Sequence, residues 1–238
     1  ARYQVQLVDR SQILSKAHFE SRLQVPEPAS MLLFGSGFFT MILGFVRRTY
    51  AAIKRFGDII GSLLGLLIFS PVMLIVAFLV KLTSPGPVFY SQIRVGKDGR
   101  IFRMFKFRTM RVDAEQSTGP VWAQKNDNRI TLFGGVMRKM RLDELPQFIN
   151  VLMGDMSLIG PRPERPCFVD KLKEQVPNYE QRLAVKPGIT GLAQVRNSYD
   201  ETIRDVKRKV RYDLFYIQKM NIWNDLKIMF MKILKLNL

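Results

Sequence analysis

Cysteine and histidine are almost missing from this chain of 238 residues, which contains one of each, Cys167 and His18. A single cysteine excludes a disulfide framework and a cysteine-rich zinc module. A single histidine, far in sequence from every acidic motif, excludes multi-histidine metal sites and Ser-His-Asp catalysis. Acid–base or nucleophilic chemistry would therefore depend on carboxylates, Lys, Arg, Ser or Tyr.

Acidic residues are also scarce: 20 Asp and Glu stand against 37 Lys and Arg, which gives a formal net charge of +17. Such an excess predicts a polyanionic partner, either nucleic acid, anionic lipid or a phosphorylated substrate. The composition, 47% hydrophobic and 24% charged, excludes a disordered chain. The length fits one domain with appendages. The chain begins with Ala rather than Met, as expected of a fragment or a processed form.

The N-terminal quarter contains the first of two charge-free runs. Residues 1–24 form a polar appendage of mixed charge, and a proline-rich joint, residues 25–30, follows. Residues 31–46 then carry no charge, and this run of about 16 residues is just under the minimum for a spanning helix. We interpret residues 25–48 as a joint and a transmembrane or interfacial anchor. A buried core helix is the alternative.

The second charge-free run, residues 59–80, is long enough to cross a bilayer, but Ser70 and Pro71 lie at its middle. Proline removes a backbone donor and clashes with the preceding turn, so the helix must kink or break there. The residues on both sides of the run are rich in Lys and Arg, which is typical of cytoplasmic flanks. This symmetry favours a re-entrant helix-break-helix hairpin over a kinked spanning helix.

The remainder has the pattern of a mixed domain that is mainly helical. Two predicted strands, residues 88–95 and 100–109, flank an Asp-Gly turn, and alternation places Lys106 and Arg108 on one face. Helices are expected from Leu132 past Met140, from Pro146 onward and along residues 203–217. Residues 222–238 resemble an amphipathic helix on a membrane surface, and a core helix with a lysine rim is the alternative.

Asp143 and Glu144 are the acidic pair most suited to chemistry. They precede a helix that begins at proline, and its free N–H groups would hold a carboxylate ionised, as a nucleophile or a metal ligand requires. Simple helix capping is the alternative. Arg138 lies nearby, and Arg162 lies in a loop stiffened by Pro161 and Pro163. A membrane segment, paired carboxylates and rigid arginines together indicate phosphate chemistry at a bilayer.

Residues from about 52 to 238 resemble the bacterial sugar transferase family, the monotopic polyprenyl-phosphate phosphoglycosyl transferases. Seven motifs occur in the order in which the family has them. They are Lys54-Arg55-Phe56-Gly57-Asp58, Ser70-Pro71, Gln92-Ile93-Arg94-Val95-Gly96, Phe105-Lys106-Phe107-Arg108-Thr109-Met110, Leu142-Asp143-Glu144-Leu145-Pro146-Gln147, Gly154-Asp155-Met156-Ser157 with Gly160-Pro161-Arg162-Pro163, and Lys186-Pro187-Gly188-Ile189-Thr190-Gly191.

The resemblance implies an undecaprenyl-phosphate sugar phosphotransferase that moves a sugar 1-phosphate from a UDP-sugar to undecaprenyl phosphate and releases UMP. It implies that Asp143 is the nucleophile of a covalent aspartyl-phosphosugar intermediate. Glu144 would assist it, and the two carboxylates would bind Mg²⁺. The four residues expected to bind the diphosphate are Lys106, Arg108, Arg138 and Arg162. Product would pass to downstream glycosyltransferases of exopolysaccharide or other glycoconjugate synthesis.

The expected fold is therefore membrane-associated α+β: a re-entrant hairpin, a mainly helical cytoplasmic catalytic domain with a small β-hairpin, and amphipathic surface helices. The domain would span residues 49–238 on the cytoplasmic face of the bacterial inner membrane, in contact with lipid. Membrane helices are compatible with a homodimer. Residues 25–48 separately resemble a PEP-CTERM sorting signal, although about 190 residues follow it here.

Two other classes of function compete with this interpretation. A membrane-tethered nucleic-acid-binding protein would explain the charge and the aromatic residues among the basic ones, but not Asp143 and Glu144, so no nucleic-acid partner is expected. A non-enzymatic basic anchor or scaffold would use its arginines only to bind anionic lipid. The sugar is not named by the sequence; glucose or galactose 1-phosphate is expected first, then N-acetylated hexosamines.

Overall fold

The structure, a computed structural model, describes residues 28–116, 119, 127–196 and 202–236, with side chains described between residues 48 and 234 of these ranges. The predicted appendage, residues 1–24, and the start of the joint lie outside the described residues. The chain divides into two compact units, Ala1–Thr49 and Tyr50–Leu238. The second unit contains the candidate site and is the one described below.

One helix, α2 (Pro28–Thr83), contains both charge-free runs. The two runs were expected to be separate segments, but residues 49–58 between them include Ala51, Ala52, Lys54 and Arg55, which are strong helix formers. The part from Arg48 to Thr83 is long and apolar enough to cross a membrane.

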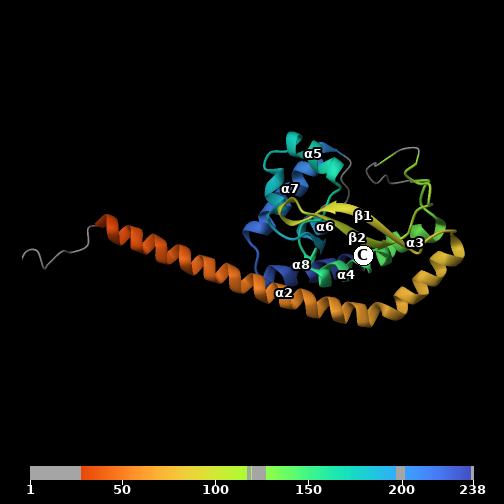
Figure 1. Cartoon of the computed structure of the whole chain (residues 1–238), viewed down its shortest axis with the longest axis horizontal. Helices are drawn as coiled ribbons and strands as arrows, with labels where there is room; N and C mark the ends of the chain where they lie inside the picture. Colours follow the sequence, from red (N-terminus) through yellow and green to blue (C-terminus); the bar gives the residue numbers. More distant parts are fainter. Residues whose placement is uncertain (1–27, 117–118, 120–126, 197–201, 237–238) are drawn as a thin grey trace, which may run out of the picture. The chain divides into compact units, whose positions relative to one another are not determined.

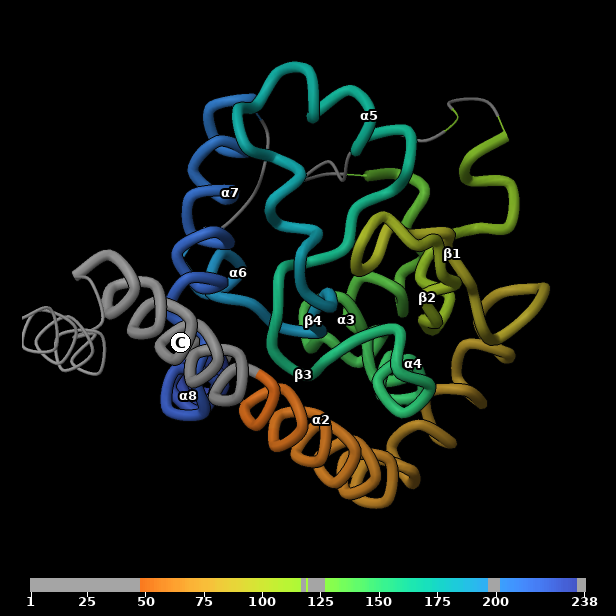
Figure 2. Tube along the Cα trace, turned by 60° about the vertical axis from the view of Figure 1, so that its left-hand side comes forward, coloured from red at the N-terminus to blue at the C-terminus, as the bar shows by residue number. Residues whose placement is uncertain are grey.

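The interruption predicted at Ser70-Pro71 is absent, because α2 stays helical through both residues. Proline lacks the N–H that would bind the carbonyl oxygen of Leu67, and the Ser70 hydroxyl donates to that oxygen instead, at 2.9 Å. A helix-break-helix was therefore the wrong local description. The C-terminal part of α2 curves along one side of the domain (Figures 1 and 2), as expected of a proline bend.

The other elements of the second unit are short helices and two small sheets (Figure 1). In chain order they are β1 (Phe89–Val95), η1 (Lys97–Gly99), β2 (Ile101–Phe107), α3 (Leu132–Met140), η2 (Leu142–Glu144), α4 (Gln147–Met153), β3 (Ser157–Ile159), α5 (Pro166–Gln175), η3 (Tyr179–Ala184), β4 (Gly188–Thr190), α6 (Leu192–Arg196), α7 (Ile203–Gln218) and α8 (Ile222–Leu236). Strands β1 and β2 are antiparallel, and β3 and β4 are parallel.

This arrangement confirms a mixed and mostly helical fold with a β-hairpin. Asp98 and Gly99 have φ of 55° and 77°, the left-handed backbone that an Asp-Gly turn provides. Helix α3 begins at the predicted residue, Leu132, and ends at Met140, and α4 begins one residue after Pro146. Helix α8 packs through Ile228 but leaves Trp223 and Phe230 exposed, so it has features of both predicted alternatives.

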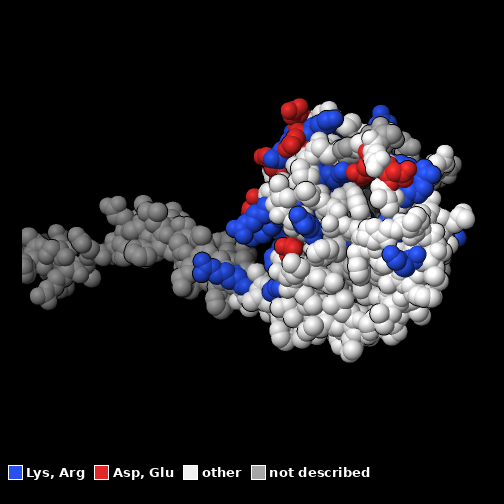
Figure 3. Space-filling model, turned by 45° about the vertical axis from the view of Figure 1, so that its right-hand side comes forward, with Lys and Arg blue, Asp and Glu red and all other residues white. Residues whose placement is uncertain are grey.

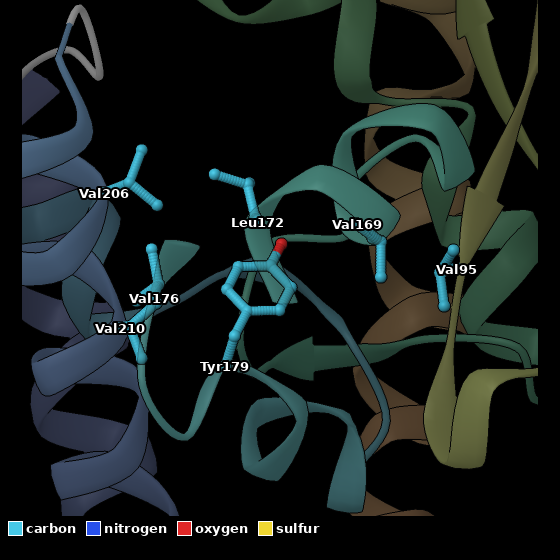
Figure 4. Packing of buried hydrophobic residues seen from close by; sticks show 7 residues of the cluster. All are labelled: Val95, Val169, Leu172, Val176, Tyr179, Val206 and Val210. Carbon is cyan, nitrogen blue, oxygen red and sulfur yellow. The ribbon is translucent and has the colours of Figure 1, made fainter. Parts of the chain in front are cut away.

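Separate apolar clusters connect these elements. In one, α5, η3 and α7 pack against the end of β1 around Tyr179, which lies between the α7 and β1 side chains (Figure 4). In another, Val76 and Val80 of α2 pack with Phe107 and Met137. The two ends of the apolar part of α2 therefore contact the same domain, since Asp58 near its start accepts from Leu158 N of β3 at 2.9 Å.

Candidate active site

The two predicted carboxylates lie on η2, a single 3-10 turn between α3 and α4. Arg141 ends α3 in the left-handed conformation, with φ of 60°, and its reversal of the chain allows the next turn to fold back. Asp143 and Glu144 are 7% and 8% exposed. Because buried carboxylates need compensating charge or hydrogen bonds, their surroundings decide what they can do.

Glu144 is held by three cations from three parts of the chain. The nearest is Arg162, which donates to its carboxylate at 2.5 Å from the proline-rich loop between β3 and α5. Lys106 Nζ of β2 is 3.5 Å away, and Arg141 is 3.9 Å away. Asp143 is held more loosely, with Lys106 Nζ at 3.9 Å. The two carboxylates therefore differ in environment although they are adjacent.

Their pKa values shift in opposite directions. Burial raises the pKa of Asp143, and the charge of Glu144 adds to that rise, although Lys106 opposes it. Burial would also raise the pKa of Glu144, but Arg162 and Lys106 outweigh it and hold that pKa well below its usual range. Side-chain cations, rather than the helix N–H groups expected from the sequence, favour the ionised form of Glu144, whereas burial dominates at Asp143.

Lys106 is the shared cation of the pair. Burial lowers the pKa of its ammonium to about 8, against the opposing charges of Glu144 and Asp143. Asn150 of α4 fixes the neighbouring backbone, because its side chain donates to Arg103 O at 2.7 Å and accepts from Phe105 N at 2.9 Å. This fully buried amide joins β2 to the helix that follows the carboxylates. Sequence reasoning did not identify it.

The remaining predicted cations separate into two groups. Arg138 lies beside the site, where its Nε donates to Thr109 Oγ1 at 2.9 Å. Burial lowers the pKa of its guanidinium, and the negative charge of Asp143 opposes that shift. Arg108 instead donates to the carbonyl oxygens of Pro85 and Ser84 at the turn after α2. Its described contacts are structural, so its role in phosphate binding stays a prediction.

The carboxylates of Asp143 and Glu144 fit a divalent cation for which the substrate supplies further oxygen ligands. Among the residues that the structure describes, no group of three or more His, Cys, Asp and Glu side chains could hold a metal. Mg²⁺ is commonly bound by one or two carboxylates together with substrate phosphates and water. Asp143 and Glu144 supply that number of carboxylates, and Asp143 is the less occupied of the two.

In such a site the cations can bind a diphosphate, and a carboxylate oxygen can attack its phosphorus. Catalysis of phosphoryl transfer is mainly positioning and charge neutralisation. The charged residues behind this site, Arg182 and Asp213, were not identified from the sequence. A signal was present: Lys209 and Asp213 occur at i and i+4 on the same face of α7 as the buried Val206 and Val210.

Comparison with known proteins adds independent evidence. Residues 49–237 match the bacterial sugar transferase family, and residues 24–48 match the PEP-CTERM protein-sorting motif. The chain is 50% identical over 181 residues to a UDP-N-acetylgalactosamine-undecaprenyl-phosphate N-acetylgalactosaminephosphotransferase of Aeromonas hydrophila, covering 76% of this chain and 43% of that protein.

Two further relatives differ in length. A UDP-glucose:undecaprenyl-phosphate glucose-1-phosphate transferase of Escherichia coli is 43% identical over 185 residues, which are 77% of this chain and 40% of the relative. An exopolysaccharide production protein PSS of Rhizobium leguminosarum is 43% identical over 187 residues, 75% of this chain and 92% of the relative. The chain thus spans about two fifths of the longer relatives and nearly all of the shorter one.

The match to the family covers most of the chain, and it includes the carboxylates, Lys106, Arg138 and Arg162 within residues 49–237. The chain therefore belongs to the bacterial sugar transferase family.

Proposed function

We propose that this chain transfers a sugar 1-phosphate from a UDP-sugar to undecaprenyl phosphate and releases UMP, as an early membrane step of glycoconjugate synthesis. The observation that carries the proposal is the difference between two adjacent buried carboxylates. Arg162 donates to Glu144 at 2.5 Å, whereas the one described ion pair of Asp143, with Lys106, is 3.9 Å long, and the pKa of Asp143 is raised. The names of the relatives supply the substrate classes.

In the first step, an ionised oxygen of Asp143 attacks the phosphorus that carries the sugar. A new O–P bond forms, the bond from that phosphorus to the bridging oxygen breaks, and the bridging oxygen leaves with UMP. Asp143 suits this role because its oxygens are less engaged than those of Glu144. Lys106 and Arg138 neutralise charge on the diphosphate, and Arg162 keeps Glu144 from repelling it.

In the second step, a phosphate oxygen of undecaprenyl phosphate attacks the same phosphorus. The Asp143 O–P bond breaks, which yields polyprenyl-diphospho-sugar and regenerates the carboxylate. Two displacements at one small site allow a water-soluble donor and a lipid acceptor to react in turn, and they predict ping-pong kinetics. When bound by Asp143 and Glu144, Mg²⁺ would supply charge neutralisation for the diphosphate.

We further propose that α2 enters and leaves the membrane on one face. Residues 54–58 near the start of its apolar part contact α8, α4 and β3: Lys54 binds Asp225 at 2.7 Å, and Arg55 donates to Val151 O at 2.5 Å. Val76 and Val80 at its other end pack against β2 and α3. A helix whose two ends rest on one water-soluble domain cannot cross the bilayer between them, which supports a re-entrant topology.

The side chains between those ends support lipid contact. Leu67, Leu74 and Phe78 are 71%, 72% and 63% exposed. The lower part of the molecule in Figure 3, where α2 runs, is almost free of charged side chains. The phosphate of the lipid acceptor would lie at the headgroup level, close to Asp143 in a domain that α2 holds against the membrane. By this account the catalytic domain faces the cytoplasm at the bacterial inner membrane.

The test is UMP release in detergent from purified protein, undecaprenyl phosphate, Mg²⁺ and a panel of UDP-sugars that includes glucose, galactose and N-acetylgalactosamine. Release with one sugar, abolished by chelator and by Asp143→Asn, is the expected result. Folded protein that releases no UMP with any sugar would contradict the proposal and favour the non-enzymatic scaffold. That alternative also predicts an unchanged phenotype for Asp143→Asn.

A further inference from the structure

The loop that carries Arg162 has its backbone held at consecutive residues. Pro161 and Pro163 have no N–H to donate, so the backbone of this segment is held mainly by hydrogen bonds to its carbonyl oxygens. The four carbonyl oxygens accept as follows: Pro161 from Gly188 N at 2.9 Å, Arg162 from Arg182 Nη2 at 2.8 Å, Pro163 from Arg94 Nη1 at 3.0 Å and Glu164 from Val95 N at 2.9 Å. Each donor lies on an element other than the loop.

Arg182 is the donor aimed at the residue that contacts Glu144. It lies on η3, is 3% exposed, and does not touch either candidate catalytic carboxylate in any described contact. Its Nη2 is 2.8 Å from Asp213 of α7, and its Nε is 3.0 Å from the same carboxylate. A third contact, from Nη1 to the Tyr179 hydroxyl at 2.9 Å, completes the set.

The apolar cluster around Tyr179 fixes this guanidinium in turn. Val206 and Val210 of α7, with Val169 and Leu172 of α5, surround the Tyr179 ring (Figure 4). Because the guanidinium is planar and holds three partners in one geometry, Arg182 can neither rotate nor retreat without losing a buried contact. It therefore presents a rigid donor to the Arg162 carbonyl oxygen.

Stability alone is a weak reason for this arrangement. A buried ion pair is often no more stabilising than apolar side chains of similar volume, so an Arg182–Asp213 pair is poor evidence of a purely structural role. Its spare N–H is instead directed to the backbone of a residue whose side chain must reach Glu144, 2.5 Å away. A shift of about 1 Å in a positioned group can lower a rate about 100-fold.

We infer that Arg182, held by Asp213, is a positioning residue for the proposed transfer: it fixes the backbone of Arg162 so that the Arg162 guanidinium stays on Glu144. The inference rests on the proposed function, and it concerns a residue that contacts no substrate. The contacts run from Asp213 of α7 to Arg182 of η3, then to Arg162 in the loop and to Glu144 in the site.

A double-mutant cycle on kcat/KM tests this chain. Arg182→Lys keeps the charge and can still pair with Asp213, but one ammonium cannot reproduce three fixed contacts. In the wild-type background we expect it to lower kcat/KM roughly 10- to 100-fold, with the same division between kcat and KM as Arg162→Ala. In the Arg162→Ala background the same change should lower kcat/KM by less than about 3-fold, because its effect passes through Arg162.

The assay uses radiolabelled UDP-sugar so that slow variants stay measurable, at a temperature well below each melting transition. Val210→Ala is the matched control, since it loosens the same cluster without removing a polar contact. It should lower the melting temperature but lower kcat/KM by less than about 3-fold, because the polar contacts that orient Arg182 remain. If Arg182→Lys does not fold, Asp213→Asn, which preserves the side-chain shape, takes its place in the cycle.

Equal losses from Arg182→Lys in both backgrounds would overturn the inference, because an effect that ignores Arg162 is structural. A loss from Val210→Ala equal to that from Arg182→Lys would overturn it as well. A wild-type protein that releases no UMP would instead contradict the proposed function, and the inference with it. An active wild type with additive losses would leave the proposed function standing.

Discussion

At the scale of single residues, two adjacent carboxylates have pKa values shifted in opposite directions. Asp143 and Glu144 share one 3-10 turn, yet Arg162 donates to Glu144 at 2.5 Å, whereas the one described ion pair of Asp143, with Lys106, is 3.9 Å long. The sequence predicted that these residues meet, through spacing and family resemblance. It could not predict their different pKa shifts, since these depend on burial and on side chains distant in sequence.

Lys106 provides a direct test of the charge at the site. Lys106→Ala should lower kcat/KM roughly 100- to 1000-fold, the usual effect of removing one preorganised donor at developing charge. Lys106→Arg should retain more activity, because the charge is preserved. The steady-state rate of UMP release measures both.

Lys97 supplies the control for that measurement. It lies in the hairpin turn with its side chain 49% exposed, so Lys97→Ala should have no effect. Equal losses from the changes at residues 97 and 106 would indicate a general effect of positive charge on membrane or substrate attraction.

Glu164 gives a prediction for stability against pH. Burial would raise its pKa, but Lys209, at 2.6 Å, Arg182 and Arg94 lower it to about 2. Because the folded pKa is below the unfolded value, the stabilisation is present above about pH 4.5 and is lost as pH falls toward 2. It amounts to about 3 kcal/mol at neutral pH.

Thermal unfolding measured from pH 7 to pH 3 checks this. Glu164→Gln should be less stable than the wild type at pH 7, and the gap should narrow toward pH 3. A gap that does not change with pH would show that the variant loses packing rather than a charge interaction.

At the scale of elements, local signals predicted the elements but not their continuity or their packing. The predictions of the Asp-Gly turn, the start of α3 and the α7 periodicity were correct because each depends on neighbouring residues. Proline was expected to kink or break α2, but the helix continues through Pro71, and the Ser70 hydroxyl donates to the Leu67 carbonyl oxygen that proline cannot reach with an N–H. The Arg182–Asp213 contact escaped prediction since it joins η3 to α7 across 31 positions of sequence.

Close packing of α2 on the domain depends on Gly65. A Cβ atom there would lie 2.9 to 3.1 Å from three atoms of the Phe148 ring, which stacks against Phe69 on α2. Gly65→Ala should therefore destabilise the folded protein by about 1–3 kcal/mol through overpacking. Gly57→Ala is the control on the same helix, because a Cβ at Gly57 meets nothing within 4 Å.

Thermal unfolding in detergent compares the two variants. Gly57→Ala should leave the melting temperature unchanged or raise it, as expected of improved helix propensity. A lower melting temperature for both, by the same amount, would show that α2 does not tolerate the change in either place and that the contact with Phe148 is not the cause.

At the scale of the whole molecule, the apolar part of α2 is proposed to enter the membrane and to leave it on the same face, where the basic domain lies. Labelling from either side of the membrane tests this. Ala51 and Lys97 are exposed on the two flanks of the apolar run, whereas Lys54 is half-buried against Asp225 and unsuitable. Cysteines at 51 and 97, introduced singly after Cys167→Ser, should react with an impermeant maleimide only from the cytoplasmic side.

Labelling of the two positions from opposite sides would contradict the re-entrant topology and would require α2 to span the membrane. The native Cys167 must be replaced first because it is exposed.

The covalent intermediate is the central claim, and one measurement tests it most directly. The purified protein is incubated with Mg²⁺ and its UDP-sugar in the absence of undecaprenyl phosphate, and released UMP is followed together with the masses of the protein and of its peptides. The account predicts a burst of about one UMP per active site and a mass increase of one phosphosugar on the peptide that contains Asp143, both absent in Asp143→Asn. UMP that appears only when undecaprenyl phosphate is present, with no adduct at any time, would contradict the account and indicate direct transfer between the two substrates.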